Sequence, residues 1–547
     1  MKLPRTPFPE NNIAMPYQYE PGTIVVGIDL GTTNTVCFVY DGSGYEVIKF
    51  GNLTVLPSYV QYKRNGTVVC GEVAKGNYGK RQFWVISNSK HIIGRPYSKE
   101  QIKNLSQNCG VPIVDDHGIP KFHLDNIKRD VSATDVASEI IRTVIDAVRE
   151  KYPGKRIAKV TVTTPAYFDN NQKTATIQAV MSAGFSRDQV DTLNEPTAAS
   201  ICYGLDNDVK KKTILVYDFG GGTFDVSILE IVNGEFIVKT TGGDNALGGV
   251  DVDKKFMELI LDKYREKYGR DFIDPSMDEG MKARYIRMLQ RVAEEHKIEL
   301  ASADSTDINV SVFDHVVAVQ LQNGEMDDSE STITITIDDM NRKIKPLVDK
   351  TITIMNDVMR EKGMTPSDID HVVLVGGSSN LRLVATTLNS VFGSAKLKQS
   401  VNPSECVAKG GCMSIVRPIK LEEITSYSLG SSIVGNRVVW VLPKHAKLPA
   451  EYSETFSNAT DNITSFSGIL IQGQCMNAGT SEPITDSMTK LEPYSYSGVT
   501  PMPRGQAKVR ETYYMNEQDL LLIDAEDVIS GRMLMNKVEF HCRESSQ

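Results

Sequence analysis

The fold of this chain is decided by the stretch Leu215-Val216-Tyr217-Asp218-Phe219-Gly220-Gly221-Gly222-Thr223-Phe224-Asp225. An apolar run leads into an acidic residue, three glycines and a threonine follow, and a second apolar run leaves the motif. This order predicts a strand, a very tight turn and a second strand. Adjacent glycines leave backbone N–H groups uncovered, with no side chain to keep a bulky anion away.

A second copy of the pattern lies near the N-terminus, at Val25-Val26-Gly27-Ile28-Asp29-Leu30-Gly31-Thr32-Thr33-Asn34. Two such hairpins can close on a nucleotide phosphate tail from opposite sides, each with a carboxylate to hold a metal ion. Neither copy is a Walker A loop, because no Gly-Lys-Ser/Thr follows, and neither glycine turn opens a helix as a Rossmann fingerprint does. A single copy would be an ordinary glycine turn, whereas two copies with matched Asp positions favour a nucleotide site.

Composition narrows the class of protein. The chain has 547 residues, which suggests about two to four domains. Its 40% hydrophobic and 24% charged residues are typical of a globular protein, and its net charge of −9 argues against a general nucleic-acid binder. Eight cysteines without a C-x-x-C pair indicate reduced thiols rather than a disulfide framework or a zinc site. No secretory signal and no apolar run of ~18 residues is present, so we expect a soluble, cytosolic protein with no membrane partner.

Strands alternate with helices up to residue 417, which predicts an α/β domain. Glu195 stands just before Pro196, a residue suited to open a helix. A strand at residues 372–375 runs into a glycine turn that does open a helix, and such a terminus suits an anion or a nucleotide sugar. Two features stay open from the residues alone. The glycine-rich segment 242–249 is either a ligand loop or a surface loop, and Lys75 is either solvated or chemically active.

The pattern changes after Pro418. Short period-2 runs separated by turns begin at residue 429, which is typical of a compact antiparallel β domain. We therefore expect a disordered tail at 1–22, the α/β domain at 23–417, a linker at 418–428, the β domain at 429–541 and a second tail at 542–547.

These motifs together resemble the seventy-kilodalton heat-shock chaperones over about residues 23–541. The two glycine hairpins are similar to the family's phosphate loops, and Asn194–Ala199 is similar to the segment that connects its two lobes. Val375–Ser378 matches the adenosine loop, and Pro501–Gly505 matches a loop of the β domain. The resemblance implies a two-lobed actin-like ATPase domain, each lobe on a ribonuclease-H-like core, followed by an antiparallel β-sandwich that binds peptide.

The resemblance also implies roles for individual residues. Asp29 and Asp218 would hold Mg²⁺ through water, and potassium sites would involve Asp29, Asp218, Thr223 and Asp225. The catalytic set would be Lys75, Glu195, Asp218, Thr223 and Asp225, with Lys75 as the catalytic lysine and Glu195 placing the metal and the attacking water. ATP or ADP would be bound by Gly31, Thr32, Thr33, Asn34, Gly220, Gly221, Gly222, Thr223, Gly243, Asp244, Glu294, Lys297, Gly376, Gly377, Ser378 and Asn380. The relay that reports nucleotide state to the linker would consist of Pro165, Tyr167, Phe168 and Lys173.

The chain departs from the family pattern around the adenine ring. Ile298 and Asn380 stand where the family clamps the ring between two arginines, Ala301 replaces a serine, and Asn34 replaces a tyrosine. Each lost guanidinium plane removes a contact worth about 0.5–2 kcal/mol. We therefore expect weaker nucleotide binding and looser base selectivity than is usual for the family.

The linker and the C-terminal region depart as well. Residues 419–424, Ile-Lys-Leu-Glu-Glu-Ile, replace a leucine-rich run, so we expect weak docking of the linker. The family's helical lid and its acidic C-terminal tetrapeptide are not found in the sequence, so we expect micromolar or weaker peptide affinity and fast release.

By the family pattern, the peptide pocket would be lined by Ile433, Val434, Phe456, Ile469 and Ile471. Ile469 and Ile471 are two apart in one strand and should point to one face. The alternative is that all five are ordinary sandwich core. Ser431 stands where the family has a large aliphatic residue, which shrinks the apolar slot.

The leading functional hypothesis is an ATP-hydrolysing chaperone that binds unfolded or extended peptide segments, with a J-domain co-chaperone and a nucleotide exchange factor as partners. The second hypothesis is a non-refolding, nucleotide-binding relative that acts as a partner or exchange factor of another chaperone or of the ribosome, with dispensable hydrolysis. A filament former or a sugar kinase on the same fold is disfavoured by the expected β-sandwich.

Overall fold

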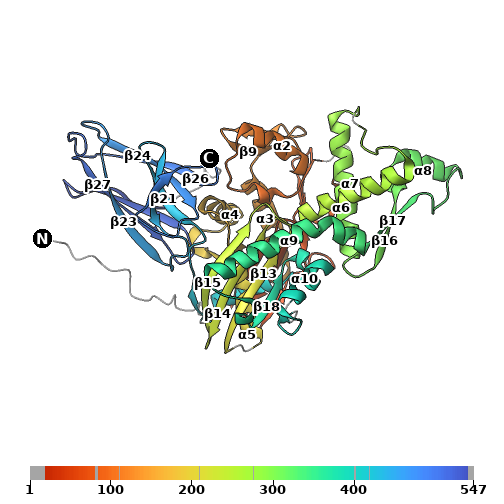
Figure 1. Cartoon of the computed structure of the whole chain (residues 1–547), viewed down its shortest axis with the longest axis horizontal. Helices are drawn as coiled ribbons and strands as arrows, with labels where there is room; N and C mark the ends of the chain where they lie inside the picture. The colour runs from red at the N-terminus through yellow and green to blue at the C-terminus, as the bar shows by residue number, and fades with distance from the viewer. Residues whose placement is uncertain are drawn as a thin grey trace.

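The computed structural model of the chain describes residues 19–539, except 81–83, 110, 208–209, 275, 399–401 and 418. Most of the tail expected at 1–22, residue 418 of the linker and the tail at 542–547 therefore lie outside the described residues. The remaining chain forms a mixed α/β body and, on the left in Figure 1, a pair of antiparallel β-sheets. We call the second unit, residues 428–539, the sheet pair.

The first mixed sheet has the strand order β12-β11-β1-β2-β3, with β4 beside β2. β1 runs parallel to β11 and antiparallel to β2. Its strands are β1 (Thr23–Leu30), β2 (Asn34–Tyr40), β3 (Tyr45–Val47), β4 (Leu56–Pro57), β11 (Arg156–Thr164) and β12 (Val190–Asn194). β1 is buried along almost its whole length, as expected of a central strand whose residues are apolar on both faces.

The second mixed sheet has the order β19-β18-β13-β14-β15-β20. Its strands are β13 (Lys211–Phe219), β14 (Phe224–Val232), β15 (Glu235–Asp244), β18 (His371–Val375), β19 (Leu397–Lys398) and β20 (Lys420–Glu422). β13 pairs antiparallel with β14 and parallel with β18, which repeats the arrangement of β1 with β2 and β11. Each predicted glycine hairpin therefore closes the corresponding strand pair of its own sheet.

Helices α5 (Glu195–Asp206) and α11 (Cys406–Val416) lie between the two mixed sheets and pack against each other. The contact uses glycine, because a Cβ at Gly410 would lie 1.8 Å from the carbonyl oxygen of Ala198. α11 also approaches β1 closely, since a Cβ at Gly27 would lie 2.3 Å from the carbonyl oxygen of Ala408. Pro196 occupies the first turn of α5, where its missing N–H has no partner to lose.

The other elements of the α/β body extend from these sheets. The helices on the first side are α1 (Glu72–Asn77), η1 (Ser89–His91), α2 (Lys99–Cys109), α3 (Ala133–Lys151), α4 (Asn170–Ser182) and η2 (Arg187–Gln189). Two small sheets accompany them. One consists of β5 (Val60–Tyr62), β6 (Val68–Cys70) and β7 (Val85–Ile86), and the other of β8 (Ile113–Asp116), β9 (Ile119–Leu124) and β10 (Arg129–Val131). The elements on the second side are α6 (Gly249–Tyr268), α7 (Glu279–Glu299), β16 (Ser305–Asn309), η3 (Val310–Val312), α8 (His315–Gln322), β17 (Thr332–Thr336), α9 (Ile337–Glu361), η4 (Pro366–Asp368), η5 (Gly377–Asn380) and α10 (Arg382–Phe392).

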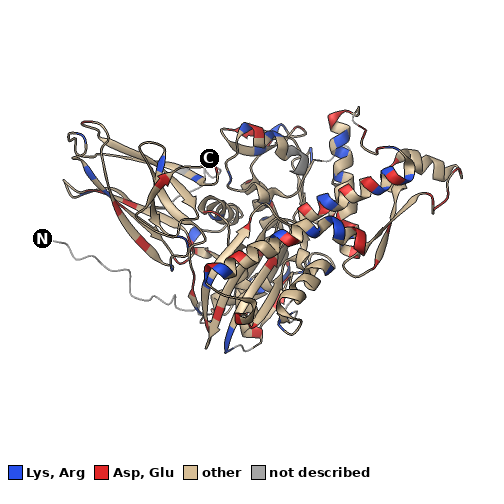
Figure 2. Cartoon of the chain, viewed as in Figure 1, with Lys and Arg blue, Asp and Glu red and all other residues tan. Residues whose placement is uncertain are grey.

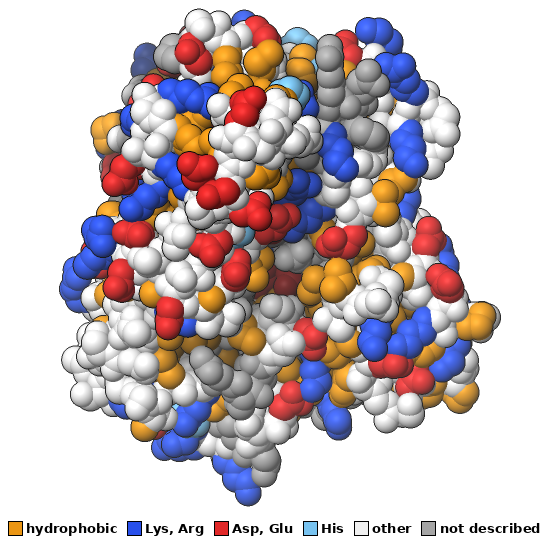
Figure 3. All heavy atoms as spheres, turned by 90° about the vertical axis from the view of Figure 1, so that its right-hand side faces the viewer, with side chains coloured by type: hydrophobic (Ala, Val, Ile, Leu, Met, Phe, Trp, Pro, Cys, Tyr) orange, Lys and Arg blue, Asp and Glu red, His pale blue; other side chains and the backbone are white. Residues whose placement is uncertain are grey.

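Charged residues are distributed over the whole α/β body, and acidic and basic positions alternate along α6, α7 and α9 (Figure 2). The side that carries α8, β16 and β17 faces the viewer in Figure 3, where acidic and basic side chains are interspersed. None of the described helices combines the length and the apolar composition needed to cross a bilayer.

The sheet pair consists of a five-stranded sheet, β25-β22-β21-β24-β26, and a four-stranded sheet, β23-β27-β28-β29. The strands are β21 (Ser428–Ile433), β22 (Arg437–Leu442), β23 (Ala450–Ser457), β24 (Ser465–Gly473), β25 (Ser481–Pro483), β26 (Thr489–Ser497), β27 (Lys508–Met515), β28 (Leu521–Asp527) and β29 (Arg532–Glu539). All of the strand pairings within each sheet are antiparallel. Leu470 of one sheet and Ile523 of the other belong to the same buried cluster, so the two sheets share a core.

The linker is docked in this structure, although its charged residues led us to expect weak docking. β20 pairs in parallel with β15 at the edge of the second mixed sheet. Leu421 packs against the core of the α/β body. Lys420 and Glu422 are accommodated by ion pairs with Glu235 and Lys447. An edge strand tolerates alternating charges because one of its faces can remain partly solvated.

The sheet pair contacts the α/β body directly. Lys173 of α4 forms a buried ion pair with Asp519, with Nζ 2.6 Å from Oδ2. Asn170 Oδ1 accepts a hydrogen bond from the backbone N–H of Leu521 at 3.1 Å. The Lys173 side chain is only 1% exposed, so this contact places two opposite charges in a dry interface.

We predict that Lys173→Met loosens the sheet pair from the α/β body. Removing one partner of a buried ion pair leaves an unpaired charge and costs about 3–5 kcal/mol. The measurement is the rate at which protease cleaves the linker at residues 419–427, which should rise in the variant. The double variant Lys173→Met/Asp519→Leu should regain protection, and Lys159→Ala, which breaks an exposed pair, serves as the control. Unchanged cleavage in Lys173→Met would contradict the prediction.

Candidate functional site

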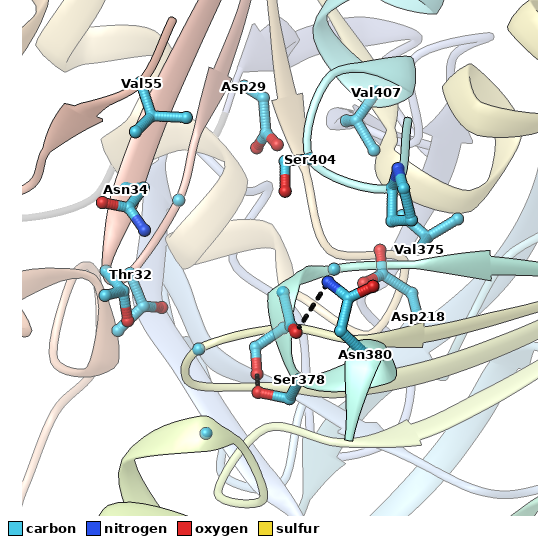
Figure 4. Close-up of a pocket in the computed structure, with 18 of the residues that line it drawn as sticks. Asp29, Thr32, Asn34, Val55, Asp218, Val375, Ser378, Asn380, Ser404 and Val407 are labelled. Atoms are coloured by element: carbon cyan, nitrogen blue, oxygen red, sulfur yellow. Dashed lines mark hydrogen bonds between the residues drawn. The ribbon is translucent and has the colours of Figure 1, made fainter. Parts of the chain in front are cut away.

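A cavity of about 460 Å³ lies where the two glycine hairpins face each other. Residues of the first hairpin, among them Thr32 and Asn34, lie on one side of it in Figure 4, and Ser378 and Asn380 lie on the other. The first hairpin contributes Asp29, Gly31, Thr32, Thr33 and Asn34, and the second contributes Asp218, Gly220, Gly221 and Thr223. The structure therefore brings together residues from positions about 190 apart in the sequence, as the paired motifs predict.

The hairpins touch each other at their tips. A Cβ at Gly221 would lie 2.2 Å from Thr33 Oγ1, and one at Gly222 would lie 2.6 Å from Thr32 Oγ1. A larger residue would collide with the Thr33 side chain at position 221, and with the Thr32 and His91 side chains at position 222. The glycines of the sequence motif therefore serve the close approach of two loops as well as access for a ligand.

A third loop follows β18 and completes the wall. Gly376, Gly377 and Ser378 line the cavity, and Ser378 Oγ donates a hydrogen bond to the carbonyl oxygen of Gly220 at 2.9 Å. Gly243 and Asp244 lie outside the lining, where Asp244 pairs with Lys350 at 2.6 Å. The glycine-rich segment 242–249 thus reaches the cavity through Gly249 rather than through the two residues that the sequence suggested.

The lysine at the base of the cavity is Lys90, not Lys75. Lys90 Nζ lies 2.8 Å from Glu195 Oε1, and both residues line the cavity. Lys75 sits on α1, outside the lining, and its Nζ lies 3.0 Å from Glu294 Oε1. The geometry therefore gives Lys90 the place that sequence reasoning gave to Lys75. Lys90 belongs to a short 3₁₀ turn with no glycine or carboxylate motif around it, so its local sequence carried no signal.

Asp29 and Asp218 line the base of the cavity, and Asp225 is buried opposite Asp218 on the neighbouring strand. Burial, followed by the charge of Glu195, raises the pKa of Asp29 to about 7 and that of Asp225 to about 7. The same two causes raise the pKa of Asp218 well above its ordinary value. Among the described residues, Asp225 Oδ2 is a buried atom without a hydrogen-bond partner. Several neighbouring carboxylates with only one ammonium group beside them form a site that attracts cations.

This donor set fits Mg²⁺ held through water. Among the described residues, no group of three or more His, Cys, Asp or Glu side chains is arranged to ligate a metal ion directly. Mg²⁺ gives up its water reluctantly and is often bound by one or two carboxylates together with substrate phosphates. Asp29 and Asp218, at the ends of the two matched strands, are placed for that mode.

The other end of the cavity is more apolar. Ile298, Ala301 and Asn380 line it, at the positions where the family pattern has two arginines and a serine. Ile298 is 59% exposed and belongs to α7, and Asn380 Nδ2 donates to the carbonyl oxygen of Gly377 at 3.1 Å. Glu294 and Lys297 line the same region, and Lys297 pairs with Asp253 at 2.7 Å. Among the described residues, no arginine lines the cavity.

The five residues assigned to a peptide pocket do not share one environment. Val434 is 79% exposed and Ile469 is 37% exposed, whereas Ile433 and Phe456 are half-buried. Ile471 is fully buried in a small cluster with Val438 and Trp440. Its assignment to an open pocket is therefore wrong in this structure, because the segment after β24 folds back and packs Cys475, Ile484 and Met488 over that cluster.

Comparisons with known proteins agree with the motifs. The sequence model of the family described as "Hsp70 protein" matches residues 25–545. The chain is 31% identical over 516 residues to a protein named "Chaperone protein dnaK" from Cyanidioschyzon merolae, covering 93% of this chain and 80% of the relative. It is 31% identical over 516 residues to "Chaperone protein DnaK 1" from a Synechococcus strain, covering 93% and 65%. It is 30% identical over 515 residues to the protein named "Chaperone protein dnaK" from Cyanidium caldarium, covering 93% and 79%.

We predict that Asp225→Asn stabilises the protein when nucleotide and divalent metal are absent. An aspartate whose pKa is raised to about 7 favours the folded state only while it is protonated, so its ionisation destabilises the fold increasingly between about pH 4 and pH 7. The neutral amide avoids this loss and should gain roughly 1–4 kcal/mol at about pH 8. The measurement is the unfolding midpoint in EDTA.

The sign of the pH dependence distinguishes this explanation from a general packing effect. The advantage of Asp225→Asn should fall by more than half between about pH 8 and pH 5, because the wild-type carboxyl regains its proton. Asp146→Asn, at an exposed position of α3, should show no such trend. An equal effect of Asp225→Asn at both pH values would contradict the buried-carboxylate account.

Proposed function

Since this chain belongs to the Hsp70 family, we propose that it is an ATP-dependent molecular chaperone whose α/β body is a two-lobed, actin-like ATPase domain. In this proposal the sheet pair is the β-sandwich that binds extended peptide. The observation that supports ATP hydrolysis most directly is the cavity in which two glycine hairpins face each other around Lys90 and the buried aspartates. The proposed ligand is ATP or ADP with Mg²⁺, and K⁺ would occupy sites formed by Asp29, Asp218, Thr223 and Asp225.

The binding roles follow from the positions of the lining residues. Backbone N–H groups of the two hairpins would receive the β- and γ-phosphates, because glycine leaves them open to an anion. The hydroxyl groups of Thr32, Thr33 and Thr223 lie on the same walls. Asp29 and Asp218 would hold Mg²⁺ through water, and the ion supplies charge neutralisation at the phosphates when bound.

Lys90 and Glu195 would carry the catalytic step. Phosphoryl transfer depends mainly on positioning and on neutralising the charge that develops at the γ-phosphate. Lys90 brings an ammonium group to the base of the cavity, and its ion pair with Glu195 fixes the position of that group. Glu195 also begins α5, so the carboxylate is anchored to one of the two helices between the sheets.

Hydrogen bonds link the cavity to the sheet pair and support communication between them. The backbone N–H of Tyr167 donates to Asp225 Oδ1 at 3.0 Å. The carbonyl oxygen of Tyr167 accepts a hydrogen bond from the hydroxyl of Tyr427 at 2.7 Å, and Tyr427 directly precedes the sheet pair. Buried Glu423 of the linker accepts from Thr197 of α5 at 2.5 Å. These contacts give the relay proposed for Tyr167 a physical route, and Lys173 reaches the sheet pair through its ion pair with Asp519.

The second candidate is the non-refolding, nucleotide-binding relative. The adenine region favours it, because Ile298 and Asn380 offer no guanidinium plane to the base and weak base contacts do not suit a tight ATPase cycle. An ATPase assay with and without a J-domain protein separates the candidates. Stimulated turnover supports the chaperone, whereas nucleotide binding without measurable turnover supports the relative.

We predict that Lys90→Ala lowers the rate of ATP hydrolysis by ~10²–10³ while ATP still binds, because the variant removes a pre-placed charge from the γ-phosphate. Lys75→Ala, which removes a lysine that lies outside the cavity lining, is the matched control and should retain most of the activity. The measurement is single-turnover hydrolysis with bound ATP. A large loss in Lys75→Ala with little loss in Lys90→Ala would restore the assignment made from the sequence.

We also predict that Ile298→Arg/Asn380→Arg tightens ADP by roughly 1–3 kcal/mol, because two guanidinium planes would then be available to cover the base. Calorimetry measures the gain. An equal gain for inorganic phosphate would show that added positive charge, rather than stacking on the base, is responsible. No gain for ADP would mean that other side chains already cover the ring.

A further inference from the structure

The interior of the sheet pair contains a hydrogen-bonded polar cluster. Glu511 of β27 accepts hydrogen bonds from the hydroxyl groups of Tyr494 and Tyr496 at 2.6 Å each, and from that of Tyr513. Tyr494 Oη also lies 2.9 Å from Ser431 Oγ. All five residues are buried, and they come from both sheets. Ser431 therefore does more than shrink the expected apolar slot, because it is one end of a polar floor.

The charge on this floor has no cation beside it. Glu454 of β23 lies directly opposite Glu511 in the four-stranded sheet and is half-buried. Like charges opposite each other on one face of a sheet are destabilising. In the described part of the chain, no Lys or Arg side chain forms an ion pair with either carboxylate. The pair therefore creates a negative potential at the inner side of β23, at the edge of the sheet.

The border of the cluster is apolar and partly open. Ile433 lies two residues after Ser431 on the same face of β21, and Phe456 lies two residues after Glu454 on β23. Phe466 pairs with Tyr496 across the strands, and their rings are stacked with centroids 6.0 Å apart. These three border residues are all half-buried.

Gly468 shows how close the floor lies to the strand backbone. Gly468 of β24 lies opposite Tyr494 of β26, and a Cβ at Gly468 would lie 2.8 Å from the tyrosine hydroxyl oxygen. An aliphatic side chain pushed against this floor would remove hydroxyl and carboxylate groups from solvent without giving them a new partner, which is unfavourable.

We propose that the binding site of the sheet pair selects segments with a Lys or Arg side chain rather than a large aliphatic one, with Glu454 and Glu511 as the specificity-determining residues. This inference rests on the proposed peptide-binding function. The aliphatic stem of a basic residue would lie along Ile433 and Phe456, and its charged head would meet Glu454 at the half-buried edge. Long basic side chains bury their stems and keep the head in polar surroundings in this way. The stacked rings of Phe466 and Tyr496 add a surface that favours a cation.

The test uses the whole chain and four fluorescent heptapeptides that differ only at the central residue, which is Leu, Gln, Lys or Glu. Fluorescence anisotropy at low salt gives the four dissociation constants. The Lys peptide should bind about ten-fold or more tightly than the Leu peptide, which corresponds to one charge-assisted contact. Glu454→Gln should reduce this preference to about two-fold and leave the Gln peptide unchanged.

Two further variants keep the experiment decisive. Glu451 lies on the opposite, exposed face of β23, so Glu451→Gln should leave the preference for the Lys peptide intact. Glu511→Gln should also abolish the preference, with near-UV circular dichroism used to check the fold. If the Leu peptide binds at least as tightly as the Lys peptide, or if Glu454→Gln and Glu451→Gln act alike, the inference is overturned while peptide binding stands. If none of the four peptides binds, the proposed peptide-binding function itself is overturned.

Discussion

The arrangement of the whole α/β body depends on one close backbone contact, between α5 and α11. A Cβ at Gly410 would lie 1.8 Å from the carbonyl oxygen of Ala198, so any side chain at position 410 would force the two helices apart. The same helix also approaches β1 closely at Gly27, where a Cβ would lie 2.3 Å from the carbonyl oxygen of Ala408. Because Glu195 begins α5 and Val407 of α11 lines the cavity, this contact sets how far apart the two sides of the site lie. Protein interiors are close-packed, so an opening of this contact would be felt at both hairpins.

The close packing has an electrostatic consequence. Bringing the two sheets together also brings Asp29 close to Asp218 and Asp225, with Glu195 beside them, and burial together with the charge of Glu195 raises the pKa of all three aspartates. Lys90 partly compensates, since its charge lowers these pKa values. The buried carboxylates therefore make this region less stable than an apolar core of equal size, and bound cations would offset that cost. Active sites commonly lower the stability of the fold in this way.

The sequence allowed the family and the coarse fold to be predicted, because those features depend on local patterns. The family match over residues 25–545 confirms the recognition, and both glycine hairpins close strand pairs as expected. The lysine could not be assigned in the same way. Lys75 lies in a six-residue helix and Lys90 in a 3₁₀ turn, and only the three-dimensional path of the chain shows that Lys90 meets Glu195 while Lys75 meets Glu294. The burial of Ile471 depends on a later segment that folds over it, which strand periodicity does not reveal.

The polar interior of the sheet pair shows a further limit of pattern reading. Val509, Glu511 and Tyr513 alternate along β27 with their side chains on the inner face, where a binary pattern would expect three apolar residues. A carboxylate can occupy that place only because hydroxyl groups from another sheet and from its own strand satisfy it, and those partners are distant in the sequence. Removing one hydroxyl would leave the buried carboxylate of Glu511 with fewer hydrogen bonds, so the cluster helps to hold the two sheets in one relative position. In the proposed peptide-binding function, such a floor changes which side chain the sheet pair receives.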